Sequence, residues 1–370
     1  MNIKKLKEIP WKHEPYSKQN WGSNFHGISS YVGRIKPSFA HWLIECLTTK
    51  DDLIYDPFCG VGTVPLESTI MGRKSIGIDL NPYAVLISKS KTDIRGLQSE
   101  IEYINNIDIS KSKYILLDNI PQWVKEYYHD ETLKEIIFLR DLFRKNDRHF
   151  LLGCLLGISH GHRPQHLSIR TGYIIPYIPN PKPPVIYKNS IEKIKEKIIR
   201  MYKDFPLVDF IPEIHHGDSR NTNYIKSNTI DWVITSPPYY DTLDYVSSNK
   251  LRLFFSGVDD FSQAELKGEL IQNKNTYIDE MVKVGIELKR VLKSTGRIAF
   301  VLGDVHYGNK SKNTALDVSK IYQQNGLFKT IDIIDDEIPA SKTTIVKYGG
   351  EKSISQKKEK LDRILILERI

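Results

Sequence analysis

The stretch that decides the fold is Asp231-Trp-Val-Ile-Thr-Ser236-Pro237-Pro238-Tyr239. Its apolar, β-branched first half predicts a buried strand of a parallel sheet. Two consecutive prolines end that strand, because neither can donate a hydrogen bond to a neighbouring strand and each fixes its own φ. The chain therefore leaves the carboxyl end of the strand in a stiff turn, and in open α/β sheets that end is where ligands bind.

The turn offers two hydrogen-bond acceptors beside an aromatic face. Ser236 presents a hydroxyl, Pro237 presents a carbonyl and Tyr239 presents a flat ring. This combination suits a planar ring that carries an exocyclic amine, which is the shape of an extruded cytosine or adenine.

Length and composition are those of an ordinary globular protein. The chain has 370 residues, 40% of them hydrophobic and 26% charged, which is enough for one large domain or two smaller ones. The net charge of +8 favours a polyanionic partner, although non-specific stickiness is an alternative for any basic protein. No apolar segment approaches the length of a membrane span, so we expect no membrane contact. The three cysteines are unclustered, which indicates a reducing, cytoplasmic setting and no metal site.

A second predicted strand ends in an acid that is followed by a glycine-rich turn. Leu53-Ile-Tyr-Asp56 predicts a short strand, while Gly60 and Gly62 allow a tight turn and a close approach of the backbone to a ligand. A phosphate site is disfavoured, because the turn lacks a Gly-Lys-Ser/Thr ending and the acid beside it would repel phosphate. A carboxylate that pairs with an ammonium group and a plain strand-to-helix turn are the two alternatives.

Two further strands end in acids, at Asp79 and Asp218. A carboxylate about 20 residues after a glycine turn is where a βαβ unit holds ribose hydroxyls, and Asp79 has that position. The carboxyl ends of parallel strands line one edge of a sheet, so we expect these two acids to meet Asp56 there. A ligand with an ammonium, a ribose diol and a purine amine fits them, as S-adenosylmethionine does. Asp56 would hold its methionine moiety, Asp79 its ribose and Asp218 its adenine amine.

The alternation of strand and helix signals breaks off between residues 95 and 212. We interpret this part as an inserted helical module, flanked by residues 1–94, an N-terminal arm and the first part of the sheet domain, and by residues 213–370, its second part. The module combines cations with tyrosines, which suits nucleic-acid contact, although a charge run is more often a solvated face. The candidate contacts are Arg163, Arg170, Lys193, Lys197 and Arg200.

The segments Asp56-Pro-Phe-Cys-Gly-Val-Gly-Thr63 and Thr235-Ser-Pro-Pro-Tyr239 together resemble the two signature motifs of bacterial DNA amino-methyltransferases. Gly77-Ile-Asp-Leu-Asn-Pro82 and Gly217-Asp218 resemble the cofactor motifs between them. The resemblance implies an α/β, class I S-adenosylmethionine-dependent methyltransferase fold, a Rossmann-like seven-stranded sheet with a final antiparallel hairpin, here with a helical insertion. The cofactor-binding residues that it implies are Asp56, Phe58, Gly60, Gly62, Thr63, Asp79 and Asp218. The catalytic residues that it implies are Ser236, Pro237, Pro238 and Tyr239.

The resemblance also implies a reaction, which is methyl transfer to an exocyclic nitrogen in double-stranded DNA. Serine at the first position of the Ser-Pro-Pro-Tyr motif favours N4 of cytosine in this family, whereas aspartate more often marks N6 of adenine. We therefore expect a cytosine-N4 methyltransferase, with adenine-N6 methylation, an RNA methyltransferase and a non-catalytic DNA-binding subunit as alternatives. A role in restriction-modification is expected, with a cognate restriction endonuclease as the candidate partner. Carbon-5 methylation is disfavoured, because it needs a thiolate, usually after a proline, and no cysteine here follows one.

Overall fold

The computed structural model describes residues 1–18, 21–171, 176–204, 210–238, 244–273, 275–307, 310–338, 345–346, 355–356 and 360–370. Its centre is a seven-stranded sheet in the order β3-β2-β1-β4-β5-β11-β8. The strands are β1 (Leu53–Asp56), β2 (Lys74–Asp79), β3 (Glu213–His216), β4 (Ile230–Thr235), β5 (Leu292–Gly303), β8 (Phe328–Ile338) and β11 (Lys360–Arg369).

The direction of the strands confirms the expected fold class. Strands β3, β2, β1, β4 and β5 are parallel, whereas β11 runs antiparallel to both of its neighbours, β5 and β8. Strands β8 and β11 are the final antiparallel hairpin. This order with one reversed strand is the class I methyltransferase topology that the resemblance implied.

Alternating strand residues point to two layers of helices. Ile54 and Trp232 pack with one layer, while their chain neighbours Tyr55 and Val233 pack with the other. This period of two is what a sheet buried on both faces requires. The first layer contains α1 (Ile3–Lys7), α2 (Pro37–Leu47) and α3 (Thr63–Ile70), and the second contains α13 (Tyr277–Val291) and α14 (Thr314–Gln324).

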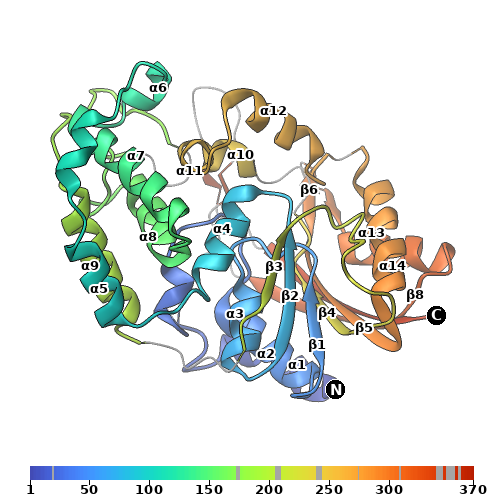
Figure 1. Cartoon of the computed structure of the whole chain (residues 1–370). Helices are drawn as coiled ribbons and strands as arrows, with labels where there is room; N and C mark the ends of the chain where they lie inside the picture. Colours follow the sequence, from blue (N-terminus) through green and yellow to red (C-terminus); the bar gives the residue numbers. More distant parts are fainter. Residues whose placement is uncertain are drawn as a thin grey trace.

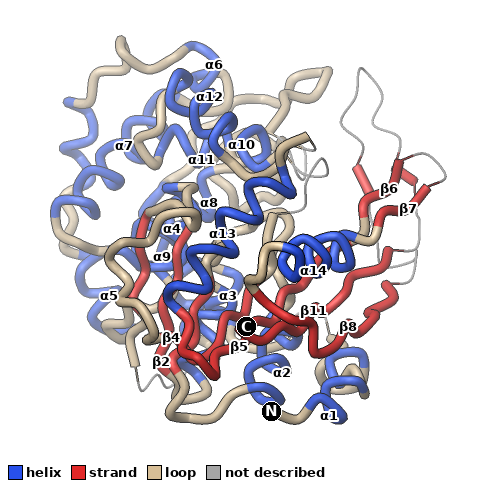
Figure 2. Tube along the Cα trace, turned by 90° about the vertical axis from the view of Figure 1, so that its right-hand side faces the viewer, coloured by secondary structure: helices blue, strands red, loops and turns tan. Residues whose placement is uncertain are grey.

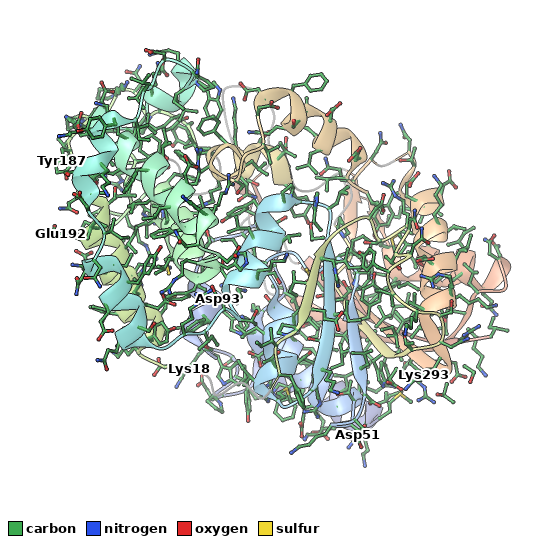
Figure 3. All side chains as sticks on the ribbon, in the orientation of Figure 1. Lys18, Asp51, Asp93, Tyr187, Glu192 and Lys293 are labelled. Carbon is green, nitrogen blue, oxygen red and sulfur yellow. The ribbon has the colours of Figure 1, made fainter. Side chains whose placement is uncertain are left out.

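The segment between β2 and β3 forms a helical layer beside the sheet, to the left in Figure 1. Its central helix is buried at every position from Phe150 to Ser159 and packs against the helix that follows β2. Asp93 joins the two parts, since its carboxylate accepts a hydrogen bond from the Phe150 N–H at 3.1 Å (Figure 3). The helices are α4 (Pro82–Ser90), α5 (Leu97–Asn105), α6 (Gln122–Lys125), α7 (Asp130–Lys145), α8 (His149–Ser159) and α9 (Ser190–Tyr202).

Three short helices after β4 lie above the carboxyl ends of the parallel strands in Figure 1: α10 (Tyr245–Ser248), α11 (Lys250–Phe255) and α12 (Asp260–Glu269). The sequence did not predict α12, because it buries only Gln263 and Leu266 and so lacks an apolar stripe. Small antiparallel pairs complete the described chain, β6 (Val305–Tyr307) with β7 (Lys310–Lys312) and β9 (Ile345–Val346) with β10 (Ser355–Gln356). Figure 2 shows the β6–β7 pair projecting beyond α14.

The N-terminal arm is fixed to the body by aromatic packing. Trp11, in the 3₁₀ turn η1 (Pro10–Lys12), stacks on Phe39 with ring centroids 4.2 Å apart. Its indole N–H donates to Asp336 at 2.9 Å, so the arm is tied to both α2 and β8. A second 3₁₀ turn, η2 (Asn24–Gly27), buries Phe25, and a third, η3 (Ile109–Tyr114), lies in the helical layer. Within the described ranges, no helix has the length and apolarity needed to cross a membrane.

Candidate active site

A cleft of about 790 Å³ opens where β1, β2 and β4 end. The residues singled out from the sequence that line it are Asp56, Phe58, Gly60, Thr63, Asp79, Asp218, Ser236 and Pro238. Gly62 and Pro237 do not line the cleft, and Tyr239 lies outside the described residues.

The glycine turn after β1 is held against the end of β2. The Gly60 N–H donates to the carboxylate of Asp79 at 2.8 Å, and the Cys59 N–H donates to the Ile78 carbonyl at 2.9 Å. Gly60 and Gly62 have φ values of 51° and 70°, in the left-handed region that glycine enters without strain. The turn therefore positions backbone N–H groups and a carboxylate together at one wall of the cleft.

Gly62 is needed for the conformation of the turn and does not line the cleft. A Cβ added there would lie 2.2 Å from the hydroxyl oxygen of Ser88 and 2.9 Å from its Cβ. We expect Gly62→Ala to destabilise the protein by about 3 kcal/mol, because strain at positive φ adds to overpacking. Urea denaturation measures this loss. Gly326→Ala is the matched control, since Gly326 has φ +62° and no atom within 4 Å of its added Cβ. Equal losses in both variants would show that the contact with Ser88 contributes nothing.

Two carboxylates form the floor of the cleft, Asp56 buried and Asp79 half-buried. Burial raises the pKa of Asp56 to about 7, although the nearby Thr235 side chain and the hydrogen bond from the Phe58 N–H lower it. Burial likewise raises the pKa of Asp79 to about 6, against hydrogen bonds from the N–H groups of Asn81 and Gly60. Each carboxylate therefore lies in a site where a cationic or hydrogen-bond-donating ligand would be favoured.

Cofactor affinity should depend on pH through Asp56. Only its ionised form can pair with an ammonium group, and about half of it is protonated near pH 7 when the pKa is about 7. We expect the affinity for S-adenosylmethionine to fall by about fivefold between pH 7 and pH 6 and to level off above the pKa. Titration calorimetry across this range measures the slope. Asp56→Asn is the control and should give a flatter profile; an unchanged slope in this variant would assign the titration to another group.

Asp218 lies at the cleft but is already paired. Its carboxylate contacts the Arg220 guanidinium at 2.6 Å, and Arg220 also pairs with Glu280 at 2.6 Å. A carboxylate has four lone-pair sites, so it can accept a further hydrogen bond from a purine amine. Arg220 fixes the orientation of the carboxylate and itself lines the cleft.

The diproline corner stands directly beside Asp56. Strands β1 and β4 are paired at Tyr55 and Val233, so their carboxyl ends are neighbours. Ser236 and Pro238 are half-buried and line the cleft, while Pro237 is buried behind them. The corner thus faces the same space as the two carboxylates on the floor.

Several lining residues were not predicted from the sequence. The rings of Tyr31 and Tyr245 stack at 6.0 Å with planes 26° apart, and both face the cleft. Arg34, Leu270 and Ile271 also line the cleft. These residues follow no strand end, so the strand-end rule could not find them.

The candidate nucleic-acid contacts divide into exposed and buried side chains. Arg163, Arg170 and Arg200 are exposed, and Lys193 pairs with Glu196 on its own helix at 2.8 Å. Lys197 is a correction to the sequence prediction. Its side chain is buried, its ammonium donates to the Gly27 carbonyl at 2.6 Å, and burial lowers its pKa to about 7. It stabilises the contact between α9 and η2 and has no surface to offer a phosphate.

Comparison with known proteins gives matches in the DNA methyltransferases. Residues 8–90 match a family model described as DNA methylase, of the N6/N4 type. The Type II methyltransferase M.MjaII of Methanocaldococcus jannaschii is 32% identical over 123 residues, which are 32% of this chain and 21% of that protein. The Type II methyltransferase M.BsoBI of Geobacillus stearothermophilus is 24% identical over 275 residues, which are 63% of this chain and 54% of that protein. The matches thus span about half or less of the length of these two relatives.

Solved structures give a weaker similarity. An S-adenosylmethionine-dependent methyltransferase from Methanosarcina mazei has a TM-score of 0.36 and 10% identity, covering 89% of this chain and 97% of its own. TrmN from Thermus thermophilus also has a TM-score of 0.36 and 10% identity, covering 94% of this chain and 52% of its own. TM-scores of this size do not support a fold assignment, which rests instead on the order and direction of the strands.

The cofactor that the resemblance implies is S-adenosylmethionine, and the residues of the cleft fit it. Asp56 is 3% exposed and has no cationic partner among the described residues, as a receptor for an ammonium group requires. Among the described residues, Asp79 accepts hydrogen bonds from backbone N–H groups alone and keeps lone pairs for ribose hydroxyls, while Phe58 and Leu270 add apolar walls. The matched segment and the shared motifs make this chain similar to the DNA amino-methyltransferases over residues 8–90.

Proposed function

We propose that the protein methylates N4 of cytosine in double-stranded DNA, with S-adenosylmethionine as donor, within a restriction-modification system. The observation that carries the proposal is the shared cleft. Ser236 and Pro238 line the same space as Asp56, Asp79 and Asp218. A base held at the corner would therefore meet the methyl donor without a further domain movement.

The cofactor side of the cleft has three acids with different tasks. Asp56 pairs with the ammonium of the methionine part, Asp79 accepts hydrogen bonds from the ribose hydroxyls, and Asp218 accepts one from the adenine amine. When bound, the cofactor supplies an electrophilic methyl group on a sulfonium. The carboxylates fix its direction, and the buried floor excludes water from the reacting atoms.

The base side of the cleft raises the reactivity of a poor nucleophile. The lone pair of an exocyclic amine is delocalised into its ring. When Ser236 Oγ and the Pro237 carbonyl accept its two N–H bonds, the nitrogen becomes more tetrahedral and its lone pair can face the methyl group. Two prolines restrict the backbone at this corner, so both acceptors would be held rigidly when a base binds. Tyr239 would stack on the base, which is worth about 1–3 kcal/mol.

The cysteines argue against carbon-5 methylation. That reaction needs a thiolate, and all three cysteines, Cys46, Cys59 and Cys154, are buried. Cys59 does line the cleft, but burial and then the charges of Asp79 and Asp56 raise the pKa of its thiol well above its usual value. It therefore stays protonated at neutral pH and does not act as a nucleophile.

Label transfer followed by base analysis tests the proposal. The chain is incubated with methyl-labelled S-adenosylmethionine and with unmethylated plasmid DNA or total RNA. We expect label in DNA alone and, after enzymatic digestion, in N4-methylcytosine. Label in N6-methyladenine would show that adenine, not cytosine, is the target base. Label in RNA would show that RNA, not DNA, is the substrate. DNA binding without any transfer would support a non-catalytic subunit. Methylome sequencing of a host that expresses the chain then gives the recognition site.

A further inference from the structure

A stretch without any acidic residue runs through the helical layer. No aspartate or glutamate occurs between Asp147 and Glu192. At its centre, residues 160–171 form a loop that follows α8, here called the arginine loop because it carries Arg163 and Arg170. With no carboxylate in the loop to offset these guanidinium groups, the loop carries a net positive charge, which attracts phosphates.

The arginine loop is folded back on the end of α8 and fastened there. The Leu167 N–H donates to the Ile158 carbonyl at 2.8 Å. From outside the loop, the ammonium of Lys188 donates to the His166 carbonyl at 2.7 Å and also to the Ser168 carbonyl. These bonds fix the backbone, so the loop loses little conformational entropy when a partner binds.

The two arginines are exposed and available. Among the described residues, none forms an ion pair or hydrogen bond with either guanidinium, and Arg163 and Arg170 are not buried. Both act on the same neighbour, His162, whose pKa is lowered by partial burial first and then by these two charges. An isolated backbone bridge between Gly161 and Arg170 brings Arg170 next to the residues that precede Arg163, so the two cations lie close together in the loop.

Arg252 links this patch to the wall of the cleft. Its side chain, from α11, is 4% exposed. One of its terminal nitrogens donates to the His160 carbonyl at 3.1 Å, where the arginine loop begins, and to the Ser30 hydroxyl at 3.0 Å. Ser30 is followed by Tyr31, which lines the cleft. A single buried guanidinium thus joins the arginine loop, the cleft wall and α11.

We propose that the arginine loop binds the phosphate backbone of the duplex beside the target base, and that Arg252 is the positioning residue that sets the loop against the cleft. The inference rests on the proposed function, because it names the surface through which that same site holds its DNA. It also selects this loop, within the inserted module of residues 95–212, as the part that meets the substrate.

The double variant Arg163→Ala/Arg170→Ala tests the contact with DNA. We expect its affinity for a short fluorescent duplex to fall about tenfold, and the slope of log K against log salt to become shallower by about 2, one for each lost phosphate contact. Its affinity for S-adenosylmethionine should not change. The control is Lys111→Ala/Lys145→Ala, which removes two exposed cations elsewhere in the helical layer and should keep the parent slope.

A double-mutant cycle tests the role of Arg252. Arg252→Lys keeps the charge but not two directed N–H bonds, and Ser30→Ala removes one acceptor with a minimal change in packing. Each should raise the KM for DNA with little change in kcat or in cofactor affinity. In the Arg163→Ala/Arg170→Ala background neither should have a further effect, because a positioning residue acts only through the loop that it positions.

The outcomes are distinguishable from failure of the proposed function. If the parent chain transfers no methyl group to DNA, the proposed function is wrong. If the parent methylates DNA but the double arginine variant binds the duplex with parent affinity and salt slope, the loop assignment is overturned. If the effect of Arg252→Lys adds to that of Arg163→Ala/Arg170→Ala, Arg252 has a structural role and does not act through the loop. If the double arginine variant loses more affinity for RNA than for DNA, the partner of the loop is RNA.

Discussion

Replacing Ser236 by alanine is expected to lower kcat by about 10²-fold while leaving the affinity for S-adenosylmethionine unchanged. The loss of one preorganised polar contact to the reacting group costs enzymes about 10²–10³ in kcat. Ser236 lines the cleft beside the cofactor floor, and its hydroxyl is one of two acceptors assigned to the target amine. Single-turnover transfer to DNA, measured with saturating cofactor, reports this loss without interference from product release.

Ser236→Asp is the informative companion variant. It keeps an acceptor at the same position, so it should retain more activity than Ser236→Ala. Calorimetric titration of both variants with S-adenosylmethionine separates the two roles. If Ser236→Ala loses as much cofactor affinity as Asp56→Ala does, the separation of the cleft into a base side and a cofactor side is wrong.

Asp56→Ala should nearly abolish cofactor binding, with an increase of about 10²-fold in Kd. A hydrogen bond to a charged group contributes about 1.5–3 kcal/mol, and each 1.4 kcal/mol is a factor of ten in Kd. The buried carboxylate of Asp56 pairs with no cation within the described part of the chain, so its favourable interaction comes from the ligand. Calorimetry with S-adenosylhomocysteine measures the change without turnover.

The same variant should not destabilise the cofactor-free protein. The pKa of Asp56 is raised to about 7 by burial, which means that its ionised form is disfavoured in the folded state. Removing it relieves that cost, so the thermal midpoint of the cofactor-free chain should stay the same or rise. Normal cofactor affinity in Asp56→Ala would show that another group in the cleft binds the ammonium.

The sequence predicted the parts of the site that depend on strand ends. Asp56, Asp79 and Ser236 each terminate or follow a strand, and parallel strands bring their carboxyl ends to one edge regardless of detailed packing. Tyr31 and Tyr245 could not be placed in this way. They reach the cleft from a loop and from a short helix after the corner, and only tertiary packing brings their rings within 6.0 Å.

In the helical layer, the spacing of residues indicated which side chains of α9 are buried, but it gave no information on the arginine loop. In α9 the buried positions are Ser190, Ile194, Lys197, Ile198 and Met201. Their spacing of three and four is the apolar face of a helix, so the position of Lys197 within that stripe indicated burial despite its charge. The arginine loop carried no such periodicity, and its closure depends on Lys188 and Arg252, which are distant in the sequence.

A crystal structure with S-adenosylhomocysteine and a duplex that contains the mapped site tests the central claim most directly. The account predicts an extruded cytosine whose N4 lies about 3 Å from both Ser236 Oγ and the Pro237 carbonyl oxygen. The cofactor ammonium should contact Asp56, with its sulfur facing that nitrogen. A target base bound away from the diproline corner, or a cofactor whose ammonium lies far from Asp56, would contradict the account.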